Sequence, residues 1–221
     1  MKEPRCAKCT EKPCRSGISD NTILPPYCPI INFPDAVEAV KERYAAADIH
    51  RLFHSAAITE KESYDISARR QGDRIIPIRP RIREIAAFAD LIGAAKIGMA
   101  FCSGLSDEAS RASAILENHN LDVVSAVCSC GALDKSILGI EPEDKIHGPE
   151  AFEAACNPLL QAELLNRAGT AFNVIVGLCV GHDMLFTLHS RAPVTTLIVK
   201  DRFTGHNPVI TLYCRYHKDL V

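Results

Sequence analysis

Residues 173–183, which read NVIVGLCVGHD, decide the fold of the C-terminal half of this chain. The run 173–178 is short and almost continuously apolar, which predicts a strand that is covered on both faces. A cysteine, a glycine and a histidine follow at once, and residues 182–189 have the pattern of a helix. A buried strand that turns directly into a helix is typical of a parallel α/β sheet.

The same arrangement recurs on both sides of this stretch. Short apolar runs at 96–101, 122–127 and 195–200 are further strand candidates, and helices are predicted at 107–118 and 158–166. Alternating strands and helices predict an open, mostly parallel sheet with flanking helices and right-handed crossovers. The sequence therefore predicts an α/β domain over residues 94–221.

Two segments precede this predicted domain. Apolar residues recur every three or four positions in much of 31–93, which predicts a helical segment packed on the core. Residues 1–30 lack any periodicity and hold four cysteines among Lys, Pro, Gly and Ser. Such a segment buries too little apolar surface to order itself, so we expect a metal to hold it together.

Composition excludes several classes of protein. The 221 residues include 25 Lys+Arg and 27 Asp+Glu, a balance that argues against general nucleic-acid binding. No apolar run approaches the ~20 residues of a membrane helix, and the first residues have no apolar secretory region. We therefore expect a cytoplasmic protein with no membrane contact, where ten cysteines indicate metal binding or catalysis rather than disulfides.

The N-terminal cysteines are candidate metal ligands. Cys6-x2-Cys9 has the spacing of a zinc-ribbon clamp, but the gaps to Cys14 and Cys28 suit an iron–sulfur cluster equally well. Four thiolates in a segment without a core predict a metal centre without identifying the metal.

A second group of cysteines follows the predicted strands. Cys102, Cys128 and Cys179 each come at a strand end, with a glycine shortly after. Because ligands of open α/β sheets bind beyond the carboxyl ends of the strands, these thiols are predicted to line one crevice. Cys156 lies just before Asn157-Pro158, which reads as a helix start whose dipole favours a thiolate. We therefore predict that these four cysteines bind a cofactor, and ordinary packing of small buried thiols is the alternative.

Histidines and charges near the predicted crevice add candidate proton carriers. His182 follows Cys179 by three residues, and these two are the predicted catalytic residues, with His182 as ligand or base. His206 in the Gly-His-Asn-Pro turn is the second choice. Lys200 and Asp201 are weaker candidates for surrounding charges.

Four stretches resemble a known family. CAKCTEKPC (6–14), ACNPLLQAELLN (155–166), VIVGLCVGHDMLF (174–186) and KDRFTGHNP (200–208) are similar to a prokaryotic group of cysteine-rich proteins, domain of unknown function 1847. The resemblance implies metal binding in a bacterial or archaeal cytoplasm. It thereby supports Cys6, Cys9, Cys14 and Cys28 as ligands, and it implies no reaction.

Three functions remain open at this point. The favoured one is an iron–sulfur protein with redox or sulfur-transfer chemistry in the crevice, served by a small-molecule or electron-transfer partner. A zinc-stapled binding or regulatory module without catalysis is the alternative. A metal-free thiol enzyme, in which Cys179 attacks and His182 or His206 is the base, is the third.

Overall fold

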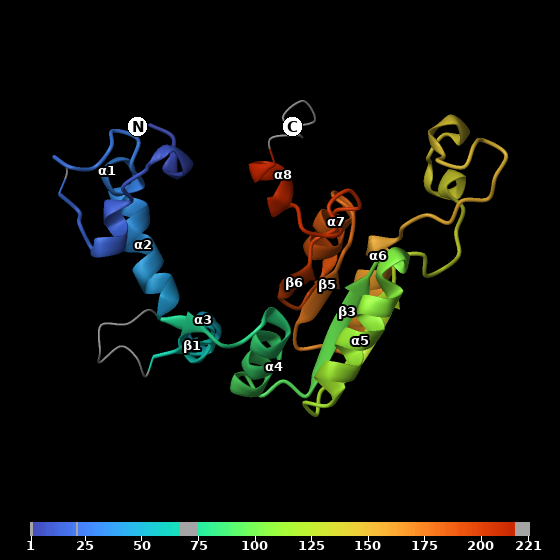
Figure 1. Cartoon of the computed structure of the whole chain (residues 1–221), viewed down its shortest axis with the longest axis horizontal. Helices are drawn as coiled ribbons and strands as arrows, with labels where there is room; N and C mark the ends of the chain where they lie inside the picture. The colour runs from blue at the N-terminus through green and yellow to red at the C-terminus, as the bar shows by residue number, and fades with distance from the viewer. Residues whose placement is uncertain (1, 21, 67–74, 215–221) are drawn as a thin grey trace. The chain divides into compact units, whose positions relative to one another are not determined.

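The computed structural model describes residues 2–20, 22–66 and 75–214 (Figure 1). The chain divides into two compact units, Met1–Ile58 and Thr59–Val221. The last seven residues of the predicted α/β domain, 215–221, lie outside the described range. The predicted boundaries at residues 30 and 93 stay predictions.

The larger unit is built on a four-stranded parallel sheet. Its strands are β3 (Lys96–Phe101), β4 (Asp122–Val127), β5 (Asn173–Val176) and β6 (Val194–Ile198), in the order β4-β3-β5-β6. Every neighbouring pair is parallel. The predicted α/β fold with a parallel sheet and flanking helices is confirmed.

Helices flank this sheet in pairs. The pairs are α4 (Arg81–Leu91) with α5 (Ser106–Glu117), and α6 (Pro158–Ala168) with α7 (His182–His189). Figure 1 shows α5 in front of the sheet, with α6 behind it. Local sequence explains the bounds of α6: the Asn157 side chain accepts a hydrogen bond from the Leu160 N–H, Pro158 is the first helical residue, and Gly169 ends the helix in a left-handed conformation.

The strand order places a topological switch point between β3 and β5. From β3 the chain passes through α5 to β4 on one side, and from β5 it passes through α7 to β6 on the other. The crevice beyond the strand ends at such a point is the usual ligand site of open α/β sheets.

The packing of β3 against β5 leaves no room for a side chain at Gly98. A Cβ atom there would lie 1.9 Å from Oδ1 of Asn173 and 2.8 Å from Leu165. Asn173 is fully buried; its Oδ1 accepts from the Thr170 hydroxyl and its Nδ2 donates to the Ser190 hydroxyl, each at 2.8 Å. At the centre of the sheet, Gly98 therefore leaves space for the buried Asn173 amide, whose oxygen and nitrogen both have hydrogen-bond partners.

A second buried amide ties together the ends of β3 and β4. Nε2 of Gln161, on α6, donates to the carbonyl of Ala126 at 2.7 Å and to that of Phe101 at 3.2 Å. These carbonyls lie within two residues of Cys128 and Cys102. Gln161 thus fixes the backbone from which both cysteines project.

The third predicted strand is shorter than expected. The run 173–178 was expected to remain extended, but β5 ends at Val176 because Gly177 adopts a left-handed φ of 65°. A Cβ on Gly177 would also lie 2.8 Å from Leu105. Glycine therefore permits both the turn and the close approach that carry the chain to Cys179.

Between β4 and α6 the chain forms a separate lobe, residues 133–155, drawn in yellow in Figure 1. It contains two short 3₁₀ helices, η5 (Lys135–Leu138) and η6 (Pro142–Asp144). The Ala155 N–H donates to the Leu133 carbonyl at 2.8 Å, which brings the two ends of the lobe together. Lys145 pairs with Asp134 at 2.8 Å, and Lys135 pairs with Glu153.

The smaller unit contains short elements in the arm and two longer helices. They are η1 (Cys6–Lys8), η2 (Pro13–Ser16), α1 (Pro29–Asn32), α2 (Pro34–Tyr44) and α3 (Ala47–Glu62), whose last residues belong to the larger unit. Pro29 begins a helix, since proline fits the first helical position.

The remaining elements of the larger unit are short. A two-stranded antiparallel sheet of β1 (Tyr64–Asp65) and β2 (Ile76–Pro77) was not predicted. The others are η4 (Ser103–Leu105) and α8 (Val209–Tyr213). Within the described ranges no helix has both the length and the apolar character needed to cross a membrane.

Replacing Gly98 tests the tight contact between β3 and β5. Gly98→Ala should lower the free energy of unfolding by about 1–3 kcal/mol, because its methyl group must displace the buried Asn173 amide. Urea denaturation measures the change, and Ser110→Ala on the exposed face of α5 is the control. Equal free energies of unfolding for the two variants would show that β5 can move to accept the methyl group without loss of stability.

Candidate functional site

The crevice cysteines Cys102 and Cys128 lie where the sheet hydrogen bonding ends. The Cys128 N–H donates to the Phe101 carbonyl at 2.8 Å, and the Cys102 N–H donates to the Val176 carbonyl at 3.1 Å. Each bond extends the parallel ladder one residue past its strand. Cys102 and Cys128 are both buried, and neighbouring strands hold their backbones in place.

Cys156 joins this group from the start of α6. The Asn157 N–H donates to the Cys128 carbonyl at 2.7 Å, so the chain before α6 lies against the turn after β4. The Cys156 side chain and, to a smaller extent, that of Cys102 lower the pKa of Cys128. Cys179 acts electrostatically on Cys156. The structure thus brings together all four cysteines for which a cofactor-binding role is predicted.

Three of these sulfurs each have a dedicated hydrogen-bond donor. The Lys200 ammonium lies 3.2 Å from Cys102 Sγ, and Nη2 of Arg202 lies 3.1 Å from Cys179 Sγ. The backbone N–H of Ser103 donates to Cys128 Sγ at 3.3 Å. The Ser103 N–H stabilises the Cys128 thiolate over the thiol.

The two paired thiols, Cys128 and Cys156, have opposite pKa shifts. A hydrogen bond from the Cys156 thiol, supported by the Ser103 N–H, lowers the pKa of Cys128 to about 5. The pKa of Cys156 is raised, because its proton is held by Cys128 and because the site is desolvated. Burial and the charge of Cys128 also raise the pKa of Cys130. The crevice therefore favours one thiolate, Cys128, beside a protonated neighbour.

The crevice sulfurs also shift the pKa of the Arg202 cation. The hydrogen bond to Cys179, together with the attraction between the two groups, raises the pKa of Arg202 further above its ordinary value. Arg202 therefore stays a cation and contacts the Cys179 sulfur directly.

The structure places the two candidate histidines differently. His182 begins α7, as predicted, and its N–H donates to the Cys179 carbonyl at 3.0 Å. Among the described residues its buried Nδ1 has no hydrogen-bond partner. Nδ1 of His206 instead accepts from the Asp201 N–H at 3.1 Å, within its own turn. The catalytic roles of Cys179 and His182 stay predictions.

Sequence reasoning missed two of the donors in the crevice. Arg202 and Ser103 were not singled out, whereas Lys200 was named as a surrounding charge. Both missed residues lie within four positions of a strand end, so the rule that located the cysteines also applies to them. For Ser103 the donor is the backbone N–H, which residue identity does not reveal.

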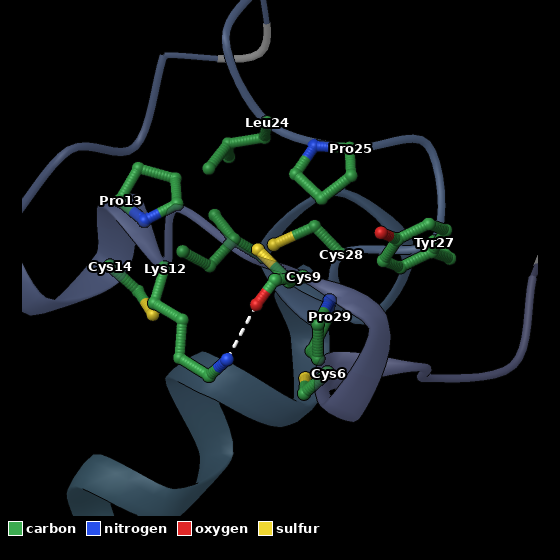
Figure 2. A pocket seen from close by; sticks show the side chains of 11 residues that line it. Cys6, Cys9, Lys12, Pro13, Cys14, Leu24, Pro25, Tyr27, Cys28 and Pro29 are labelled. Carbon is green, nitrogen blue, oxygen red and sulfur yellow. Dashed lines mark hydrogen bonds between the residues drawn. The ribbon is translucent and has the colours of Figure 1, made fainter.

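The N-terminal cysteines form a second site. Cys6, Cys9, Cys14 and Cys28 line one cavity of about 150 Å³, together with Lys12, Leu24, Tyr27 and four other residues. In Figure 2 their side chains lie around this cavity, and they come from separate segments: Cys6 from η1, Cys9 from the end of η1, Cys14 from η2 and Cys28 from the residue before α1. Cys28 is buried, whereas Cys6 and Cys14 are exposed.

Hydrogen bonds connect separate segments of this arm. The Tyr27 hydroxyl donates to the Lys8 carbonyl at 3.2 Å, and the Asn32 side chain accepts from Lys2 N–H at 2.9 Å. Lys12 has a left-handed φ of 45°, and its ammonium donates to the Cys9 carbonyl (Figure 2). Among the described residues of the arm, only Leu24 and Cys28 are buried apolar side chains. The arm therefore gains little stability from a core.

In residues 2–20, 22–66 and 75–214, no group of three or more His, Cys, Asp or Glu side chains is arranged to hold a metal ion. The assignment of Cys6, Cys9, Cys14 and Cys28 as metal ligands, and of the crevice cysteines as cofactor ligands, stays a prediction.

The low pKa of Cys128 can be tested by titration. With a pKa of about 5, Cys128 is a thiolate at pH 6, whereas an ordinary thiol with a pKa of about 8.5 is still protonated. The ultraviolet thiolate absorption of the wild type minus that of Cys128→Ser should therefore show a step centred near pH 5. Cys214→Ser should retain the step. A difference step centred at the pH of ordinary thiols would contradict the assignment.

Comparison with known proteins identifies the family. A family model described as "Protein of unknown function (DUF1847)" matches residues 28–197, a range that contains all four crevice cysteines and Cys28. "Uncharacterized protein MJ0455" of Methanocaldococcus jannaschii is 35% identical over 213 residues, which cover 96% of this chain and 95% of that protein. No solved structure matches the chain. The matched range exceeds half of the sequence, and the chain belongs to the DUF1847 family.

Proposed function

We propose that this chain is a metal-binding protein and that Cys6, Cys9, Cys14 and Cys28 are the ligands. The observation that supports this most directly is that all four thiols line one cavity. Thiolates are strong ligands for iron–sulfur clusters and for zinc. Lys12 lies in the same cavity lining.

We propose an iron–sulfur cluster, rather than a single zinc ion, as the group that this cavity holds. Zinc draws four sulfurs to about 2.3 Å from one point. The four cysteines instead surround a cavity of about 150 Å³, which accommodates a group of several atoms. When bound, a cluster supplies one-electron redox chemistry, tuned by hydrogen bonds to its sulfurs and by solvent exposure.

The weak internal packing of the arm supports the same proposal. Because the arm has almost no buried apolar side chains, a metal would contribute much of the free energy that orders it. The expected role of the centre is therefore structural as well as chemical. A zinc ion would fulfil the structural role alone, which is the function of the alternative zinc-stapled module.

We infer that the crevice carries the chemistry of this protein. The four thiols, the Lys200 and Arg202 cations and the N-terminus of α6 lie together at the carboxyl edge of the sheet. The site lowers the pKa of Cys128, and a thiolate is the reactive form in both redox and sulfur-transfer reactions. A small molecule or an electron-transfer protein is the expected partner.

Metal analysis of the full chain tests the first proposal. Purified without oxygen, the wild type should contain iron and acid-labile sulfide and absorb visible light. The double variant Cys6→Ser/Cys9→Ser should lose this centre, because half of its thiolate ligands are gone. Cys214→Ser is the matched control and should keep it. If the wild type contains zinc and no sulfide, the zinc-stapled module is the correct function. If it contains no metal, both the cluster and the zinc module are wrong.

Hydrogen exchange distinguishes a local loss from general unfolding. In the double variant, the amides of residues 1–30 should exchange faster, whereas those of the sheet should keep their protection. Unchanged exchange in the arm would show that it is ordered without the centre.

A further inference from the structure

Cys128 and Cys156 are one pair of crevice thiols that the backbone holds close together. Cys128 and Cys156 are 28 positions apart in the sequence. The hydrogen bond from Asn157 N–H to the Cys128 carbonyl, at 2.7 Å, nevertheless fixes the two segments against each other. A disulfide needs two Cα atoms within about 7 Å and side chains directed at each other. The Cys156 side chain is also the largest influence on the pKa of Cys128, so the two thiols are neighbours.

Cys128 is the better nucleophile of the two. Its sulfur accepts the Ser103 N–H at 3.3 Å and lies 3.7 Å from the Ser103 hydroxyl. Cys156 contributes its own proton to the same sulfur. A thiolate stabilised by the Ser103 N–H and by the Cys156 thiol is present at neutral pH, and its sulfur can attack an electrophile.

The interaction that activates Cys128 also keeps Cys156 protonated. The pKa of Cys156 is raised chiefly by the hydrogen bond to Cys128, then by burial and by the negative charge of Cys128. Converting Cys128 to a neutral, covalently bound sulfur removes the first and third of these causes. Cys156 would then ionise more readily, at the moment when a second nucleophile is needed.

We propose that Cys128 and Cys156 are a redox dithiol that reduces small disulfides, with Cys128 as the attacking residue and Cys156 as the resolving residue. This proposal rests on the redox function inferred for the crevice and assigns its substrate class. Lys200 and Arg202, which already contact the neighbouring sulfurs Cys102 and Cys179, stabilise an outgoing thiolate in the same crevice.

The reaction balances in two exchanges. The Cys128 thiolate attacks R–S–S–R, which forms Cys128–S–S–R and releases RS⁻. Cys156 then attacks the Cys128 sulfur, which forms the Cys128–Cys156 disulfide, and its proton goes to the second departing RS⁻ to give RSH. Two electrons pass from the dithiol to the substrate, and the first RS⁻ takes a proton from solvent.

Peptide mapping of the full-length chain tests the pair. The reduced protein is treated with bis(hydroxyethyl) disulfide, quenched in acid and mapped without reduction by mass spectrometry. Cys130→Ser is the background, so that the peptide with Cys128 carries a single cysteine. We expect a Cys128–Cys156 cross-link and two equivalents of released thiol per chain. Because this measurement leaves both paired residues in place, it does not depend on how their variants fold.

Two variants assign the order of attack. With Cys156→Ser the reaction should stop at a mixed disulfide on Cys128, with one equivalent of thiol released. With Cys128→Ser the rapid release should be lost, at least a tenfold decrease in rate. Cys214→Ser should react like the wild type. A probe trapped on Cys156 instead of Cys128 would overturn the assigned order.

The outcomes separate this pair from the wider crevice proposal. A cross-link from Cys179 or Cys102 would overturn the assigned pair and leave a redox crevice standing. No reaction at any of the four crevice thiols would overturn both. A metal retained by Cys6→Ser/Cys9→Ser and released when Cys128 is replaced would also overturn the dithiol, because these thiols would then be ligands.

Discussion

The whole α/β unit depends on the close approach of β3 and β5 at Gly98. Strand β3 can lie between β4 and β5 only because residue 98 has no side chain to displace the buried Asn173 amide. That position makes three successive strand ends neighbours and puts the switch point between β3 and β5. The Gln161 amide then fixes the ends of β3 and β4. The convergence of the crevice cysteines is thus a consequence of backbone packing rather than of contacts between the thiols.

Much of this fold could be predicted because its signals are local. Apolar runs identified all four strands of the parallel sheet, and Asn157-Pro158 identified the start of α6. The end of β5 could not be found from hydrophobicity, since Leu178 continues the apolar run after Gly177 has turned the chain. The strand order, and with it the partners of each cysteine, depends on long-range packing. The contacts of Arg202 with Cys179 and of Cys156 with Cys128 belong to this second class.

The two cysteine sites differ in what holds their sulfurs in place. In the crevice, sheet hydrogen bonds and buried packing fix Cys102 and Cys128. In the arm, Cys6 and Cys14 are exposed on short 3₁₀ turns with little packing beneath them. A site on rigid elements can tune the reactivity of a thiol, whereas a site on a weakly packed arm needs its ligand in order to form.

The closed ends of the lobe at 133–155 have a consequence for how this family can vary. Because Leu133 and Ala155 are hydrogen-bonded to each other, the chain between them leaves the sheet and returns to nearly the same place. Its ion pairs, Lys145 with Asp134 and Lys135 with Glu153, are internal to the lobe. Insertions or deletions here would change the spacing between Cys128 and Cys156 in the sequence while leaving the two residues where they are. A fixed-spacing motif is therefore a poor way to recognise this pair, and a search by backbone position is the appropriate one.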